Sequence, residues 1–221
     1  MARSHGAHAD IFGKRKRRSG TGVLWNWDEA EMILHFIRHG KTIANEKKLY
    51  CGATNLPLSP KGYAELATLK KCITYPLSPL YIVSGLLRTL QTANLLFDHP
   101  TLNTIPQLKE MHFGTFEMQG FKELSLLSSY QNWIADIENT TPPEGENKQT
   151  FVRRVMHGFL EVQHLCKLHS TNSALIVSHG GVIATIMEHH FPKHKHFYTW
   201  QPDFGRGYTL FLGENKHYKN I

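Results

Sequence analysis

The stretch "LHFIRHGKTIANEKKLYCG", residues 34 to 52, decides the fold of this chain. A mostly apolar run from Ile33 to Ile37, typical of a strand buried on both faces, stops at Arg38 and His39. Two polar side chains at the end of a buried strand are explained if that end lies at a site for an anion. A turn that happens to carry polar residues is the plain alternative, so the rest of the chain has to decide.

A second stretch, "SALIVSHGGVIATIMEHHF" at residues 173 to 191, repeats this arrangement: an apolar strand, then a histidine with glycines, then a helix. Periodicity predicts further strands and helices between the two stretches. The strands are expected at residues 80–83 and 102–108, and the helices at 58–73, 86–97, 121–137 and 149–168. This alternation predicts an α/β fold, a three-layer sandwich with a mostly parallel central sheet flanked by helices. Ligands of such sheets bind at the carboxyl ends of the strands, where both histidine stretches place their polar residues.

Composition is that of a globular protein, with 221 residues of which 41% are hydrophobic. Three widely spaced cysteines, Cys51, Cys72 and Cys166, suit reduced thiols better than disulfides and lack the spacing of zinc ligands. The sequence has no apolar run of the roughly 18 to 20 residues that span a membrane and no secretory signal. We therefore expect a cytoplasmic protein that does not bind membranes.

Residues 1–31 differ from the rest, because they are rich in Gly, Ser, Ala and basic residues and show no periodicity. We predict a flexible basic tail over 1–31 and one domain over 32–221, which Met32 could begin. The run "KRKRR" at residues 14 to 18 holds part of the formal charge of +7. A binding module for anions or nucleic acids, driven by this tail, is the hypothesis from a different functional class.

The polar residues at the strand ends are those that a phosphate site needs. Arg38 and Arg88 offer planar forks of donors that fit phosphate oxygens. At an effective dielectric constant near 20, a charge about 4 Å away contributes on the order of 4 kcal/mol before desolvation. Asn45 and the amides of the glycine-rich helix start at Gly180 complete an oxyanion pocket.

Two histidines and one carboxylate could perform the chemistry. We expect His39 and His179 to face each other across the pocket, His39 as a neutral nucleophile whose second nitrogen is held by the Gly40 carbonyl. His179 would donate to the phosphoryl oxygens. Glu110, at the end of the third expected strand, is the best-placed acid for the leaving alcohol. General acid catalysis of this kind is typically worth about 10² to 10⁴ in rate.

Four segments occur together in this order: "RHGKTIAN" (38–45), "SGLLRTLQTA" (84–93), "LKEMHFGTFEM" (108–118) and "VSHGG" (177–181). With them the sequence resembles the histidine phosphatase superfamily, the phosphoglycerate-mutase-like proteins, from Met32 to about Leu212. The resemblance implies a phosphomonoesterase that needs no metal and no cofactor and forms a phosphohistidine on His39. It also implies that Glu110 is the proton donor, His179 the second catalytic histidine, and that the phosphate is bound by Arg38, Asn45, Arg88, His179 and Gly180.

Within the superfamily, "LYCGATNLPLSPKG" (49–62) and "LKEMHFGTFEM" are most similar to the alpha-ribazole phosphatases, which remove the 5'-phosphate of alpha-ribazole 5'-phosphate in cobalamin biosynthesis. Two departures, Thr89 and the run "TFEM" at 115–118, lie near substrate-facing loops. A broad-specificity small-molecule phosphatase therefore stays open. A phosphoglycerate mutase fits less well, because mutases carry longer insertions than the span from Arg88 to Glu110 allows.

The expected partner is a small phosphorylated metabolite rather than nucleic acid, and the sequence leaves a homodimer open. The histidine-rich segment from His189 to His196 raises the question of a metal site. An exposed basic loop is the preferred interpretation, because no carboxylate or cysteine completes a ligand set.

Overall fold

The computed structural model describes residues 31–192 and 194–221. The predicted basic tail lies, except for Glu31, outside the described residues. A sheet of six strands in the order β3-β2-β4-β1-β5-β6 forms the centre. The strands are β1 (Met32–Arg38), β2 (Tyr81–Val83), β3 (Leu102–Thr104), β4 (Ser173–Ser178), β5 (Gly207–Leu212) and β6 (His217–Asn220). Four of them are parallel, whereas β5 and β6 are antiparallel to their neighbours.

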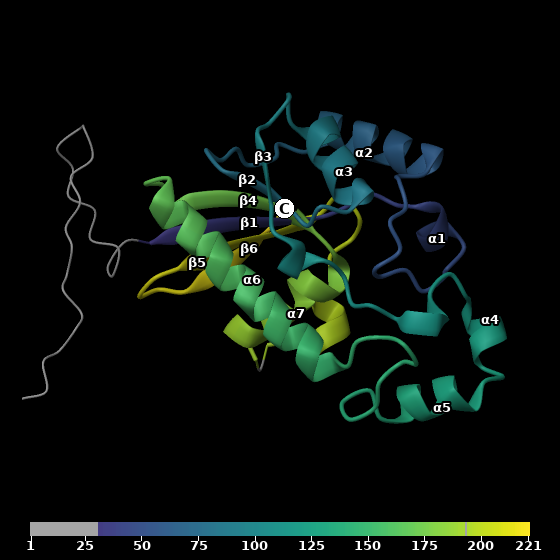
Figure 1. Ribbon diagram of the computed structural model, residues 1–221. Coiled ribbons are helices and arrows are strands. Elements are labelled where there is room, and N and C mark those ends of the chain that lie inside the picture. Colours follow the sequence, from purple (N-terminus) through teal and green to yellow (C-terminus); the bar gives the residue numbers. More distant parts are fainter. Residues whose placement is uncertain (1–30, 193) are drawn as a thin grey trace, which may run out of the picture.

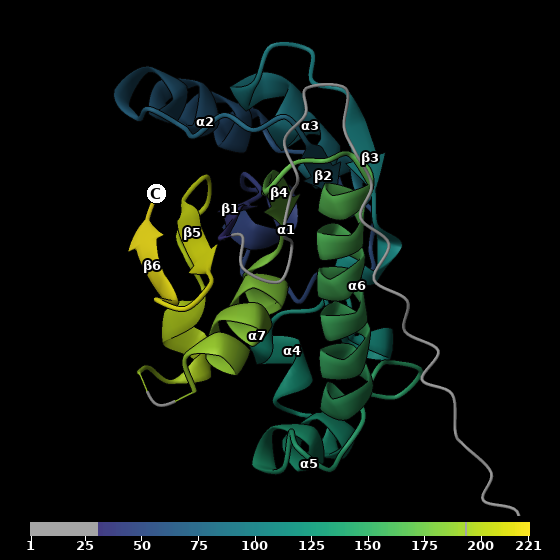
Figure 2. The same cartoon turned by 90° about the vertical axis from the view of Figure 1, so that its left-hand side faces the viewer.

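Helices cover both faces of this sheet, which confirms the predicted sandwich. In Figures 1 and 2, α2 and α3 lie over one face, and α6 and α7 lie over the other. The helices that cover the sheet are α2 (Pro60–Cys72), α3 (Leu87–Leu96), α6 (Lys148–Leu168) and α7 (Gly180–His190). Shorter ones are α1 (Ile43–Glu46), α4 (Phe121–Leu124), α5 (Ser128–Ala135) and the 3-10 helices η1 (Pro106–Leu108), η2 (Gly114–Phe116) and η3 (Phe197–Trp200).

The apolar run in β1 is explained by this double cover. Leu34 and Phe36 pack with α6 and α7, whereas Ile37 packs in a second cluster with α2 and α3. All three side chains are fully buried. Because successive side chains of a strand point to opposite faces, a strand covered on both sides is mostly apolar, and the buried His35 is satisfied by a hydrogen bond with the Thr209 hydroxyl at 2.9 Å.

The two histidine stretches end side by side, as predicted. In the parallel pairing of β1 and β4, Arg38 lies opposite Ser178, and the His39 amide donates to the Ser178 carbonyl at 3.0 Å. Strands β1 and β4 have their carboxyl ends at the same end of the sheet. The histidines that follow them, His39 and His179, therefore lie close together.

The third strand is shorter than predicted. β3 ends at Thr104, and Pro106 begins the 3-10 helix η1. Proline has no amide hydrogen to donate to a neighbouring strand, so it cannot continue the ladder. Glu110 therefore lies in a loop beyond η1 rather than at the tip of a strand.

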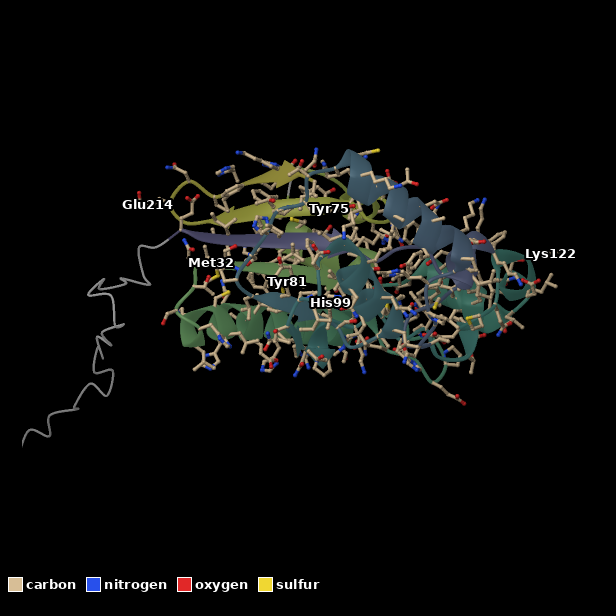
Figure 3. All side chains as sticks on the ribbon, turned by 90° about the horizontal axis from the view of Figure 1, so that it is seen from above. Met32, Tyr75, Tyr81, His99, Lys122 and Glu214 are labelled. Carbon is tan, nitrogen blue, oxygen red and sulfur yellow. The ribbon has the colours of Figure 1, made fainter. Side chains whose placement is uncertain are left out.

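Residues 121–137, predicted as one helix, form α4 and α5 with a break at Leu127, whose backbone is extended. Tyr130 and Trp133 of α5 pack with Phe116 in a small core of their own. Figure 1 shows α4 and α5 away from the sheet, and Figure 3 places Lys122 of α4 at the end opposite Met32. Within the described residues, no helix combines the length and the hydropathy that crossing a membrane requires.

Candidate active site

His39 is buried directly beyond β1, and one of its ring nitrogens is held as predicted. Its Nδ1 lies 2.6 Å from the carbonyl oxygen of Gly40. A carbonyl only accepts, so the network assigns the proton to Nδ1 and leaves Nε2 with a free lone pair. The ring faces His179, with 5.1 Å between the centroids and 62° between the planes.

Both rings are held in the neutral form. Burial, reinforced by the charges of Arg88 and Arg38, lowers the pKa of His39 well below its ordinary value of 6.5, and the Gly40 hydrogen bond opposes this only in part. Burial, Arg88, His39 and Arg38 likewise lower the pKa of His179. A neutral imidazole has the lone pair that a nucleophile needs.

Arg38 lies over the ring of Phe204, with its guanidinium carbon 3.9 Å from the ring centroid. Its Nη1 donates to the Pro202 carbonyl at 2.8 Å, while Nε is buried and has no partner among the described residues. A Cβ at Gly180 would lie only 3.1 Å from the guanidinium carbon, so the arginine sits against the first residue of α7. An unpaired buried donor beside a helix N-terminus suits an anionic ligand.

Arg88 is the most deeply buried charge of the site, with 1% of its surface exposed. It donates to the carbonyl oxygens of Gly52 at 2.7 Å and Thr54 at 2.8 Å. Its Nε points to Nδ1 of His179 at 3.3 Å. The loop 52–54 thereby fixes the plane of the guanidinium.

His179 is engaged at both ring nitrogens, which sequence reasoning did not anticipate. Because Nδ1 accepts from Arg88, the proton sits on Nε2, which lies 2.8 Å from the hydroxyl of Ser84. The Ser84 hydroxyl is also 3.2 Å from that of Thr89. To donate from Nδ1 to a phosphoryl oxygen, His179 needs the tautomer with the proton on Nδ1. The Ser84 hydroxyl can bond Nε2 in either tautomer, because it both donates and accepts.

Glu110 extends from its loop to the carboxyl ends of the same strands. Its Oε2 accepts from the amide of Gly181 at 2.9 Å, and its Oε1 accepts from the amide of Met111 at 3.0 Å. A Cβ at Gly181 would lie 2.4 Å from Oε1, so only glycine allows this approach. The carboxyl group is thus held at the start of α7, beside Arg38 and His179.

Asn45 serves first as part of a helix cap. Its Oδ1 accepts from the amide of Thr42 at 2.9 Å and from the Thr42 hydroxyl at 3.0 Å in the capping box of α1. Its amide nitrogen is the group left for a ligand. Gly180 is the first residue of α7, where helix amides are free to meet an anion.

Glu117 is a residue that sequence reasoning passed over, although it lies in the "TFEM" run. Its carboxylate accepts from the amides of Gly52, Ala53 and Thr54 at 2.7 to 3.2 Å, and from the hydroxyl of Thr54. Burial alone would raise the pKa of Glu117, but these bonds and one from Phe113 lower it overall. It therefore organises the loop that orients Arg88.

The described residues of the histidine-rich segment form no assembled set of metal ligands. Within residues 31–192 and 194–221, no group of three or more His, Cys, Asp or Glu is arranged to hold a metal ion. His189 and His190 end α7, and His190 packs on Phe159. Burial lowers the pKa of His190 to about 4.

The site at the carboxyl ends of β1 and β4 contains two histidines, two arginines and a carboxylate. This combination is the one expected of a histidine phosphatase. The sequence profile of the histidine phosphatase superfamily (branch 1) matches residues 34–203. The chain belongs to this superfamily.

Within the superfamily, the chain is similar to phosphatases and to phosphoglycerate mutases. The chain is 33% identical to adenosylcobalamin/alpha-ribazole phosphatase of Salmonella typhimurium over 71% of this chain and 78% of that protein. It is 28% identical to 2,3-bisphosphoglycerate-dependent phosphoglycerate mutase 2 of Gloeobacter violaceus over 70% and 74%. Among solved structures, a putative alpha-ribazole-5'-P phosphatase from Escherichia coli matches with a TM-score of 0.74 and 27% identity, covering 86% of this chain and 94% of that one.

Proposed function

We propose that this histidine phosphatase hydrolyses a phosphate monoester through a phosphohistidine on His39. The observation that carries the proposal is the hydrogen bond between His39 Nδ1 and the Gly40 carbonyl, which leaves the lone pair of Nε2 available; burial, which lowers the pKa of the ring, favours the same neutral form. Nε2 attacks phosphorus in line while Glu110 protonates the departing alcohol. The phosphoryl group rests on Arg38, Asn45, Arg88, His179 and the amide end of α7 at Gly180.

The second half of the reaction reverses the role of Glu110. As a carboxylate it takes a proton from a water molecule that attacks the phosphohistidine, and inorganic phosphate leaves. Each half step transfers one phosphoryl group and one proton, so the balance closes without a metal or a cofactor. His179 supports the phosphoryl oxygens from Nδ1 once its proton has moved to that nitrogen.

Substitution of the nucleophile tests this mechanism. We expect His39→Ala to lower kcat/KM by at least about 10³-fold, because no other neutral imidazole can replace its lone pair. Rapid quenching of the natural enzyme with labelled substrate should trap a base-stable, acid-labile phosphoenzyme that this variant does not form. His157→Ala, an exposed histidine of α6, is the matched control. Undiminished turnover in His39→Ala would refute the assignment.

We further propose alpha-ribazole 5'-phosphate as the substrate. Support comes from curated relatives at 32% to 34% identity that are named alpha-ribazole phosphatases. The panel that tests it compares kcat/KM for alpha-ribazole 5'-phosphate, 3-phosphoglycerate, sugar phosphates and nucleoside monophosphates. Similar values across the panel favour a broad-specificity phosphatase, and transfer from 2,3-bisphosphoglycerate to phosphoglycerate favours the mutase.

The location, the partners and the oligomeric state of this enzyme stay predictions. We expect a cytoplasmic location, no affinity for membranes and no specific nucleic-acid partner. A homodimer is also open, and light scattering after size-exclusion chromatography decides it.

A further inference from the structure

The loop that carries Glu110 is held by side chains rather than by helix or strand. It spans residues 109–113 between the 3-10 helices η1 and η2. Three successive amides of this loop, at 111, 112 and 113, donate to carboxylates at 3.0 to 3.4 Å. Those carboxylates belong, in order, to Glu110, Glu146 and Glu117. The position of the acid therefore depends on groups from elsewhere in the fold.

Arg154 in the long helix α6 holds the other side of this loop. Its Nη1 donates to the carbonyl oxygens of Gln107 at 2.7 Å and Lys109 at 2.9 Å. Its Nη2 approaches the carbonyl oxygen of Glu110 itself at 3.4 Å. One planar fork thus spans the backbone just before the carboxyl group that protonates the leaving alcohol.

Glu146 fixes the orientation of that fork. Nε and Nη2 of Arg154 donate to its two carboxylate oxygens at 2.9 and 2.7 Å, the bidentate geometry of a strong pair. The Glu146 amide also donates to the carbonyl of His112 at 2.8 Å. The pair therefore joins α6, the connector before it and both ends of the Glu110 loop.

Open space borders the pair, whereas Met111 on the other side of the loop is buried in the larger core. A cavity of about 470 Å³ is lined by Glu110, His112, Glu146 and Arg154 among others. Helix α6 packs closely on η1, which precedes the loop, since a Cβ at Gly158 would lie 2.9 Å from the Gln107 side chain. Without the fork, the loop can shift into the cavity.

We propose that Arg154, oriented by Glu146, is a positioning residue that sets the reach of the Glu110 carboxyl group to the leaving-group oxygen. The inference rests on the proposed acid role of Glu110. Arg154 touches no reacting atom, and it acts on the step in which the alcohol departs. That step needs a proton when the alcohol is a poor leaving group and hardly needs one when it is a nitrophenol.

The test compares an alkyl phosphate with 4-nitrophenyl phosphate in the full-length enzyme. For Arg154→Lys and Glu146→Gln we expect kcat for the alkyl ester to fall about 10- to 100-fold, while the aryl ester changes less than about threefold. Lysine keeps the charge near His179 but loses the fork, so it separates geometry from electrostatics. Arg153→Met, the exposed neighbour on α6, is the matched control and should leave both rates unchanged.

A double variant distinguishes positioning from mere support of the fold. Once Glu110→Gln has removed the acid, adding Arg154→Lys should slow the alkyl ester no further, because residues that act through one group are not additive. Equal slowing of both esters by Arg154→Lys, or additive losses in the double variant, would overturn the inference. Thermal unfolding of each variant shows whether the folded fraction has changed.

Failure of the proposed function itself looks different. If the natural enzyme hydrolyses neither ester nor any substrate of the panel, the phosphatase proposal fails. If Glu110→Gln slows both esters equally, Glu110 is not the general acid, and the positioning role of Arg154, which depends on that assignment, is also refuted. If Glu110→Gln discriminates between the esters and Arg154→Lys does not, only the positioning role is lost.

Discussion

His39 shows how one side chain is tuned by its burial. His39 is 6% exposed and is near the charges of Arg88 and Arg38, so its protonated form is disfavoured. We expect the ring resonances of His39, assigned with a His39 substitution, to titrate below pH 6.5 in an NMR titration. A midpoint at or above 6.5 would contradict the lowered pKa.

The same shift makes stability depend on pH. Because the folded-state pKa of His39 and His179 lies below the unfolded value of 6.5, the unfolded chain binds more protons in acid. The contribution of these two histidines is present above pH 6.5 and is lost as the pH falls through and below that value. Urea unfolding at a series of pH values should show the free energy of unfolding decline over this range, and a His39→Gln variant should show a smaller decline.

Ser84 is the residue that lets His179 hold either tautomer. We expect Ser84→Ala to lower kcat/KM by roughly tenfold, because a buried ring nitrogen left without a partner costs about 1 to 3 kcal/mol. Ser78→Ala, another buried serine, which pairs with Ser173 far from the site, is the matched control. An unchanged kcat/KM in Ser84→Ala would show that the hydroxyl does not assist His179.

At the scale of elements, the loop 52–54 and the run at 115–118 form one unit through Glu117. The carboxylate binds three successive amides of the loop, whose carbonyls in turn accept from Arg88. This arrangement places a residue outside the site in control of a residue inside it.

Glu117→Gln tests that control. We expect inorganic phosphate to inhibit the variant at least about tenfold more weakly, because hydrogen bonds to a charged group contribute roughly 1.5 to 3 kcal/mol. Glu123→Gln is the control, since Glu123 also accepts from a backbone amide, that of Gly120, but serves the cap of α4. Equal inhibition of the natural enzyme and Glu117→Gln would separate the loop from phosphate binding.

At the scale of the whole molecule, the described fold begins at β1. Met32 is buried, pairs with Leu212 of β5, and packs in the larger core. We predict that a chain beginning at Met32 keeps its fold and its kcat/KM, because the sheet and every proposed site residue lie beyond that position. The two chains are compared by circular dichroism and by activity. A chain from Met32 that aggregates or is inactive would contradict the predicted domain boundary.

The basic run at residues 14 to 18 belongs to the same scale. If it binds nucleic acid, the affinity should fall steeply with salt and vanish in the chain from Met32, while hydrolysis is retained. Salt-dependent nucleic-acid binding by the 221-residue chain, without hydrolysis of any phosphate monoester, would favour the non-enzymatic hypothesis over the phosphatase.

Sequence alone determined the parts of this protein that depend on local pattern. Apolar runs that stop at Arg38 and at His179, joined by helical periodicity, predicted the sandwich and the meeting of two strand ends, since parallel neighbours share one carboxyl edge. Only the tertiary structure decided what no local pattern encodes. It made β5 and β6 antiparallel, placed Glu110 in a loop, and brought Ser84, Glu117 and Arg154 to their partners. The physical reason is that these hydrogen bonds depend on which elements pack against each other, whereas apolar periodicity shows only which face of an element is buried and not its partner.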